Sequence, residues 1–194
     1  MHFIKLNRIH FAQAIHLNQP NYKKLRMKIS KQGHIGCFFF VQYFGGGKMA
    51  RIAYRDSDID LMARMMRAEA EGEGNQGMLY VGNVIVNRVI GNCLDFKDVR
   101  TVKQVIFQVQ GGNYSFEAVQ KGNVFYQRAR ESERRLALQN VKYWRDHPAR
   151  FALWYFNPSG ACPPTWYDQP FTGQFKQHCF YEPKAGTCDS VYKG

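Results

Sequence analysis

The chain has 194 residues, a length that fits about one domain and an extension. Hydrophobic residues make up 45% and aromatic residues 15%, which is ample for a packed core. The formal net charge of +12 is uneven, because residues 1–48 hold eight Lys or Arg and no acidic residue, while residues 49–194 hold nineteen basic and fifteen acidic residues. The apolar run IGCFFFVQYF at 35–44 is too short to span a bilayer, so a membrane-spanning helix is excluded there.

The change in composition places a boundary near Met49. Residues 1–48 show no clear helical or strand period, and we expect a disordered basic extension or a translated stretch ahead of a true start at Met49. Such an arm could instead bind nucleic acid or an anionic polymer. Aromatic and basic residues are not interleaved in it, so we expect no nucleic-acid partner, and the short apolar run at 35–44 leads us to expect no membrane partner.

The 49–194 region reads as mainly helical. One of Asp56, Ser57 or Asp58 should cap a first helix, DLMARMMRAEAE, which Gly72 and Gly74 stop. The following pattern predicts a central buried helix over 76–90, a short helix after Thr101, a loop at 109–115, a helical turn at 116–122 and a third long helix over 132–144. Strands are expected at 151–156, before the turn NPSG, and at 178–183. The fold class is therefore α+β, mainly helical, with a small β-sheet near the C-terminus.

The five cysteines do not form a metal motif, since no pair has the C-x-x-C spacing. Cys162, His178, Cys179 and Cys188 could in principle surround an ion, but adjacent His and Cys rarely point at one metal. We therefore expect no metal and no cofactor. Disulfides are compatible with the sequence, which leaves their connectivity open.

Three glutamates alternate in RAEAEGEG (67–74), and helical spacing separates them. Glu69 follows Met62 by seven residues and Met65 by four, so it lies on the apolar stripe. Glu71 follows Arg67 by four residues on a basic, solvated face, where an ion pair is the plain explanation. The role of Glu73, between two glycines, stays open as a second carboxyl, a substrate contact or a loop former.

The position of Glu69 suits a proton donor. Partial burial disfavours the charged form of a carboxyl, and the C-terminal end of a helix acts in the same direction. A carboxyl that holds a proton near neutral pH is what general acid catalysis needs. The structural alternative is a buried carboxyl bonded to backbone amides or to an arginine such as Arg88.

Several blocks resemble the SleB/CwlJ family of spore cortex-lytic cell-wall hydrolases, from about Asp58 to the C-terminus. The blocks occur in family order: ARMMRAEAEGEGNQGMLYVGNVIVNR, VIFQ, FEAV and ALWYFNP, with Trp166 and QP after them. FYQRARESE and QFKQHCFYEP are more similar to the CwlJ branch. The resemblance implies a lysozyme-like and lytic-transglycosylase-like domain over 49–194, with a groove for glycan.

The family's essential glutamate lies in a GEARGE-like block, which is AEAEGE here, so the resemblance assigns the catalytic role to Glu69. Ala68 replaces a glycine and Glu71 an arginine of the SleB-type block. The added charge at Glu71 could shift the titration of the acid or alter substrate contacts.

The resemblance implies cleavage of the glycan of cortex peptidoglycan between N-acetylmuramic acid and N-acetylglucosamine during germination. Glu69 would protonate the leaving oxygen. Hydrolases normally use a second carboxylate, and none is clearly placed, so a lytic transglycosylase with one acid fits better. We expect substrate contacts from Glu73, Gln108, Phe116, Tyr155, Asn157 and Trp166. For the aromatic residues, core packing is the competing explanation.

The resemblance also implies a location in the spore coat, after synthesis in the mother cell without a signal peptide. The expected partners are cortex peptidoglycan and a coat protein. Two other functions remain open: a coat-resident binding or scaffolding protein without catalysis, and a glycan hydrolase that cleaves a different bond.

Overall fold

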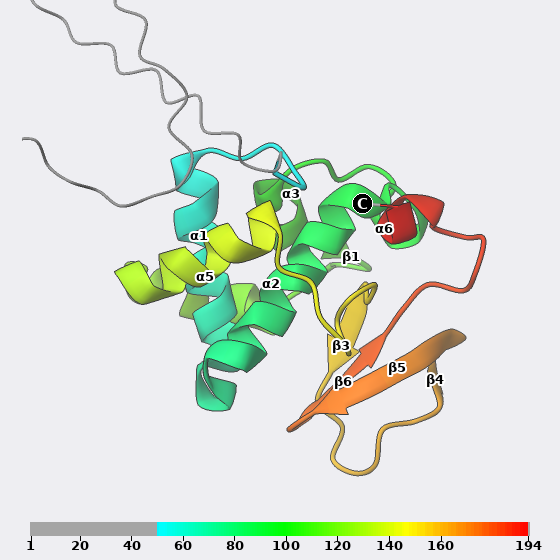
Figure 1. Ribbon diagram of the computed structural model, residues 1–194. Coiled ribbons are helices and arrows are strands. Elements are labelled where there is room, and N and C mark those ends of the chain that lie inside the picture. Colours follow the sequence, from blue (N-terminus) through cyan, green and yellow to red (C-terminus); the bar gives the residue numbers. More distant parts are fainter. Residues whose placement is uncertain (1–49, 194) are drawn as a thin grey trace, which may run out of the picture. The chain divides into compact units, whose positions relative to one another are not determined.

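The computed structural model describes residues 50–193, so the expectations for residues 1–48 and for Met49 lie outside the described part of the chain (Figure 1). Three helices pack against one another to form the helical part: α1 (Asp56–Ala70), α2 (Gly74–Gly91) and α5 (Glu131–Lys142). Shorter helices are α3 (Val102–Ile106), α4 (Glu117–Gln120) and α6 (Asp189–Lys193), with 3-10 turns η1 (Glu71–Glu73), η2 (Leu94–Phe96) and η3 (Asn123–Phe125).

The sheet is antiparallel and comes from the last third of the chain. Its strand order is β3 (Trp154–Phe156), β6 (His178–Tyr181), β5 (Gln169–Phe175) and β4 (Thr165–Trp166). Trp154 pairs with Tyr181 and Phe156 pairs with Cys179. His178, the first residue of β6, therefore lies beyond the end of β3. Figure 1 shows this sheet below the helices. The expected α+β fold, mainly helical with a small C-terminal sheet, is confirmed.

Helix α2 forms the centre of the core, as its all-round apolar pattern predicts. Val81, Val84 and Ile85 are fully buried, and so are Met62 and Met66 of the α1 stripe. The helices cross closely where α2 has a glycine: a Cβ added to Gly82 would lie 2.3 Å from Oδ1 of Asn140 on α5. A residue without a side chain is therefore what lets α5 approach α2.

Several boundaries differ from the expectations. Arg55 occupies the position before α1, and its backbone N–H donates to Oδ2 of Asp58 over 2.8 Å, so Asp58 closes the first turn from inside the helix. The expected loop at 109–115 contains a hairpin, β1 (Val109–Gln110) with β2 (Asn113–Tyr114). The strand expected over 151–156 begins only at Trp154. Strands β4 and β5 and helix α6 were not predicted, since QPFTGQF lacks a period-2 alternation.

Four cysteines form two disulfides. Cys93, between α2 and η2, joins Cys188 just before α6, and Cys162 joins Cys179 in β6. This settles the connectivity that the sequence left open. Within residues 50–193, no three His, Cys, Asp or Glu side chains gather in a way that could hold a metal ion.

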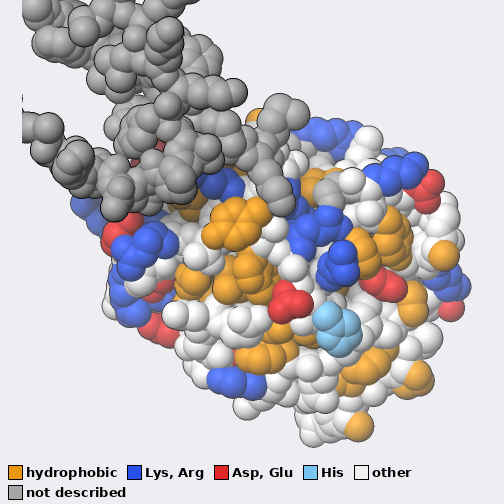
Figure 2. All heavy atoms as spheres, viewed as in Figure 1, with side chains coloured by type: hydrophobic (Ala, Val, Ile, Leu, Met, Phe, Trp, Pro, Cys, Tyr) orange, Lys and Arg blue, Asp and Glu red, His pale blue; other side chains and the backbone are white. Residues whose placement is uncertain are grey.

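Charged side chains of both signs are scattered over the face drawn in Figure 2, with apolar side chains between them. Over the described residues, no helix has the length and apolar character needed to cross a bilayer.

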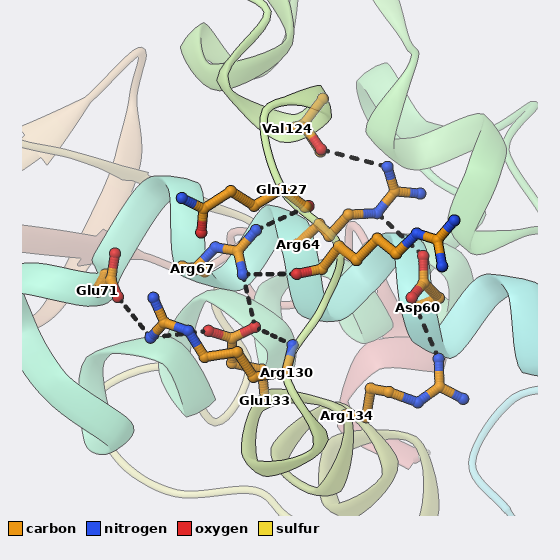
Figure 3. A network of polar contacts seen from close by, with 10 residues as sticks. Asp60, Arg64, Arg67, Glu71, Val124, Gln127, Arg130, Glu133 and Arg134 are labelled. Atoms are coloured by element: carbon orange, nitrogen blue, oxygen red, sulfur yellow. Dashed lines mark hydrogen bonds and ion pairs between the residues drawn. The ribbon is translucent and has the colours of Figure 1, made fainter.

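The ion pair expected between Arg67 and Glu71 is wrong. Arg67 is only 8% exposed, and its guanidinium donates to Oε2 of Glu133 on α5 over 3.0 Å (Figure 3). Glu71 instead pairs with Arg130 over 2.8 Å at the surface. Arg67 can be buried because the carboxylate of Glu133 neutralises its charge. Glu133 is 66 residues away in the sequence, so helical spacing cannot reveal this partner.

Candidate active site

A pocket of about 450 Å³ opens where the end of α1 meets the α4–η3 segment and the turn between β5 and β6. Its wall is strongly polar. Three glutamates, two lysines and one histidine line it: Glu69, Glu73, Glu117, Lys121, Lys176 and His178. A polar, open pocket of this kind suits a ligand with many hydroxyl and amide groups better than an apolar one.

Glu69 lies half-buried in the last turn of α1, and its carboxylate accepts two hydrogen bonds. Oε1 accepts from the backbone N–H of Ala118 in α4 over 3.0 Å. Oε2 accepts from the hydroxyl of Tyr155 in β3 over 3.0 Å. Glu69 thus has features of both alternatives considered for it: it bonds a backbone amide, as a structural carboxyl would, and it lines the pocket, as a catalytic one must. Among residues 50–193, no arginine forms an ion pair with it.

Tyr155 is a fixed donor to Glu69. Burial raises the pKa of Tyr155 well above its ordinary value, and the neighbouring Glu69 charge adds to this, while Arg88 opposes it. The phenol therefore keeps its proton and can donate across the whole range of ordinary pH.

Arg88 of α2 lies buried beneath this pair. Its Nε donates to the carbonyl oxygen of Leu153 over 2.8 Å, and its guanidinium lies over the rings of Phe96 and Phe116, 4.7 and 4.6 Å from their centroids. Burial lowers the pKa of Arg88 to about 10, against the opposing effects of Tyr155 and Glu69. Arg88 thus supports the site electrostatically without an ion pair to Glu69.

Glu73 and His178 form a second polar pair in the same pocket. Oε2 of Glu73 lies 2.9 Å from Nδ1 of His178, and the two side chains are only 10% and 12% exposed. Oε1 of Glu73 accepts from the backbone N–H of Gln177 over 3.1 Å, and its carbonyl oxygen accepts from Lys176 Nζ over 2.8 Å. The pair thus fixes the β5–β6 turn against η1.

The residues expected to contact substrate fall into two groups. Glu73 and Asn157 line the pocket, and the Asn157 amide bonds the side chain of Gln177 over 3.1 Å. The other four do not line the pocket. Tyr155 donates to Glu69, and Phe116 is buried against the Arg88 guanidinium with only 2% of its surface exposed. Gln108 donates to the carbonyl oxygen of Asp95, and the Trp166 ring packs against the Phe156 ring with centroids 4.7 Å apart.

Sequence reasoning gave no role to His178, Lys176, Lys121 or Glu117. His178 was weighed only as a metal ligand beside Cys179, whereas the structure joins it to Glu73. The sequence feature that could have identified His178 is its position as the polar first residue of the strand HCFY, whose next three residues are buried.

The network in Figure 3 joins α1 to the segment that follows the pocket residue Asn123. Arg67 donates to the carbonyl oxygens of Gln127 and Arg128 over 2.9 and 3.0 Å, and Arg64 donates to that of Val124 over 3.4 Å. These bonds tie the segment after Lys121 to α1, so the helix that carries Glu69 also fixes the facing wall.

Comparison with known proteins shows which family this fold belongs to. Residues 72–181 match the family described as Cell Wall Hydrolase. The chain is 56% identical over 144 residues to the cell wall hydrolase CwlJ of Bacillus subtilis, covering 74% of this chain and 98% of that protein. It is 34% identical over 127 residues to a spore cortex-lytic enzyme of Oceanobacillus iheyensis, covering 66% of this chain and 42% of that protein.

Among solved structures, the catalytic domain of the germination-specific lytic transglycosylase SleB from Bacillus anthracis superposes with a TM-score of 0.52 at 28% identity, covering 67% of this chain and 98% of that domain. The class is therefore a cell wall hydrolase with the fold of SleB catalytic domains. The chain belongs to the SleB/CwlJ family, in its CwlJ branch.

Proposed function

We propose that the protein is a peptidoglycan-lytic enzyme of the spore cortex that acts in germination. It cleaves the glycan strand between N-acetylmuramic acid and N-acetylglucosamine as a lytic transglycosylase, with Glu69 as the general acid. The observation that carries this proposal is the position of Glu69 on the pocket wall, with one donor at each carboxylate oxygen.

In the first step, the Glu69 carboxyl gives its proton to the oxygen that links the two sugars. The bond from that oxygen to C1 of the muramic acid breaks, and positive charge develops at C1. The hydrogen bonds from Ala118 and Tyr155 hold the carboxyl group in a fixed orientation on the pocket wall. General acid catalysis of this kind contributes about 10²–10⁴-fold to a rate.

In the second step, the C6 hydroxyl of the same muramic acid attacks C1 and closes an anhydro ring. A retaining hydrolase would instead need a second carboxylate as nucleophile. Glu73 is a candidate in the pocket, but its Oε1 accepts from the Gln177 amide and its Oε2 lies 2.9 Å from Nδ1 of His178. A carboxylate so engaged is a poor nucleophile, which favours transglycosylation.

We also propose that the protein acts from the spore coat, next to the cortex. Residues 49–194 carry nineteen basic and fifteen acidic residues, a net charge of +4. A modest positive charge favours association with an anionic glycan or coat surface.

The test is digestion of purified cortex by the wild type and by Glu69→Gln, followed by mass spectrometry of the products. We expect anhydro-muramic ends from the wild type and at least a 10²-fold loss in the variant. Glu71→Gln is the matched control, since Glu71 lies on the same helix end but is exposed and bonded to Arg130, and it should stay active.

Full activity of Glu69→Gln would overturn the acid assignment. Reducing ends in place of anhydro ends would make the protein a hydrolase. Binding to cortex without any product would favour a scaffolding role.

A further inference from the structure

Two exposed aromatic residues follow directly on residues that line the pocket. Lys121 and Asn123 line it, and the chain then turns through η3 to Phe125 and Tyr126, which are 57% and 75% exposed. A 3-10 turn rises about 2 Å per residue, so the backbone of Phe125 lies about 4 Å along the turn from that of Asn123. These two aromatics also open the block FYQRARESE, to which the single-acid mechanism gives no role.

The backbone that carries the two rings is fixed on both sides. Val124 is fully buried, and its carbonyl oxygen accepts from Arg64 over 3.4 Å. After Tyr126, the carbonyl oxygen of Gln127 accepts from Arg67 over 2.9 Å (Figure 3). The turn thus places one apolar side chain in the core and holds the next two outside it. A ligand that binds such a prearranged surface loses less free energy to ordering.

The rings themselves are also oriented. The Phe125 ring is nearly parallel to that of Phe107, with 9° between the planes and centroids 6.0 Å apart, which is an offset stack. Phe107 therefore backs the Phe125 ring, while more than half of Phe125 stays open. The Tyr126 hydroxyl lies 3.4 Å from the carbonyl oxygen of Lys121, so this side chain reaches back towards a residue of the pocket.

A polymeric substrate needs contacts outside the pocket. A volume of about 450 Å³ accommodates a drug-sized ligand, so a long glycan strand continues over the surface next to the pocket. The C–H groups on one face of a β-linked sugar ring form a flat apolar surface that matches an aromatic ring. The N-acetyl and hydroxyl groups at the edge of the sugar need polar neighbours, and Lys121 and Asn123 stand beside the two aromatics.

We propose that Phe125 and Tyr126 form an aromatic platform that stacks on N-acetylhexosamine rings of the strand beyond the two that flank the cleaved bond; this rests on the proposed function. The platform continues the pocket along the chain, which is why a strand already bound at Glu69 is its occupant. A protein partner fits less well, since a specific interface buries about 1,000 Å² or more, and the residues on both sides of the platform in sequence are polar or charged.

The first experiment measures binding without cleavage. Each variant is made in the Glu69→Gln background and titrated with peptide-free cortex glycan, sorted by size into long strands and tetrasaccharides. We expect Phe125→Ala and Tyr126→Ala each to weaken the binding of long strands about 3- to 10-fold, the effect of one lost stacking contact. The binding of tetrasaccharides, which extend little beyond the cleaved bond, should change less than about twofold.

Matched variants separate the ring from its apolar bulk and from general surface effects. Phe125→Leu keeps an apolar contact for Phe107 but lacks a ring, so it should bind long strands as weakly as Phe125→Ala, and Phe125→Trp should bind them as the parent does. Tyr143→Ala is the control, because Tyr143 is 59% exposed after α5 and does not line the pocket. Thermal unfolding of each variant checks that the fold is intact.

The second experiment measures cleavage with Glu69 in place. Phe125→Ala should raise KM on long strands by a factor similar to its binding loss, with a smaller effect on kcat, because a remote stacking contact forms in the ground state as well as in the transition state. An equal loss on long strands and tetrasaccharides would mean that the variant disturbs the pocket, and it would refute the platform.

Unchanged binding of long strands by Phe125→Ala and Tyr126→Ala, with Glu69→Gln inactive, would refute the platform and leave the proposed function standing. That result would favour a protein partner for the two rings. An active Glu69→Gln would instead overturn the proposed function, and the platform would then be judged from KM on long and short strands.

Discussion

The hydroxyl of Tyr155 donates to Oε2 of Glu69 over 3.0 Å, across 86 residues of sequence. This bond joins the helical part to the sheet at the point where the pocket opens. Tyr155→Phe removes one hydrogen-bond donor and leaves the ring in place. Because hydrogen bonds to a charged group contribute about 1.5–3 kcal/mol, we expect at least a tenfold loss of kcat on cortex fragments. An unchanged kcat would show that the Ala118 amide alone suffices to hold Glu69.

The same residue should make stability depend on alkaline pH. The folded-state pKa of Tyr155 lies above its ordinary value of 10.0, so above pH 10 the unfolded chain loses this proton first. The folded state then binds more protons, and its stability falls as pH rises. Urea unfolding between pH 8 and 11 should show a steeper decline for the wild type than for Tyr155→Phe. Because Tyr181 and Tyr192 also have raised pKa values, only the difference between the two curves is diagnostic.

The buried ion pair behind the pocket should matter far more than the exposed one. Glu133→Ala leaves Arg67 buried without its carboxylate, and removing one partner of such a pair typically costs about 3–5 kcal/mol. Glu71→Ala is the matched control, because Glu71 and Arg130 are 53% and 56% exposed and such pairs contribute about 0–1 kcal/mol. Equal losses in urea denaturation would contradict the assignment of Arg67 to the interior.

The two disulfides should stabilise the fold unequally. Cys93 and Cys188 are 95 residues apart, and Cys162 and Cys179 are 17 apart. In the chain-entropy description, closing these loops contributes about 4–5 and about 3 kcal/mol. Paired Cys→Ala variants compared by urea unfolding should follow this order, after mass spectrometry confirms the remaining bond. The reverse order would mean that the unfolded chain is not the state these bonds act on.

Gly82 should be intolerant of a side chain. Gly82→Ala would place Cβ against Oδ1 of Asn140, whose Nδ2 donates to the Leu79 carbonyl oxygen over 2.9 Å. Overpacking of this kind typically destabilises by about 1–3 kcal/mol. Gly160→Ala meets no atom within 4 Å and should change stability by less than about 0.5 kcal/mol. Similar thermal midpoints for the two variants would argue against the close crossing of α2 and α5.

What the sequence could predict depended on local periodicity. The spacing of Met62, Met65 and Met66 identified the buried stripe of α1, and all three are fully buried. The apolar pattern of 76–90 likewise located α2 within a few residues of its bounds. These elements are specified by neighbours along the chain, which is what a period measures.

What could not be predicted depends on residues far apart in sequence. Arg67 was assigned to a solvated face because its partner Glu133 is 66 residues away. His178 was judged by its neighbour Cys179, whereas the carboxylate that lies 2.9 Å from its Nδ1 belongs to Glu73. Strand β5 pairs through a bulge near Gly173 and has no simple alternation, so its existence follows from β6 and not from its own residues.

The pocket joins residues that are made early and late along this sequence. Glu69 would leave the ribosome early, but Lys176 and His178 follow roughly a hundred residues later, and the sheet closes only with them. Under the proposed function, a nascent or prematurely terminated product would carry the acid without its pocket.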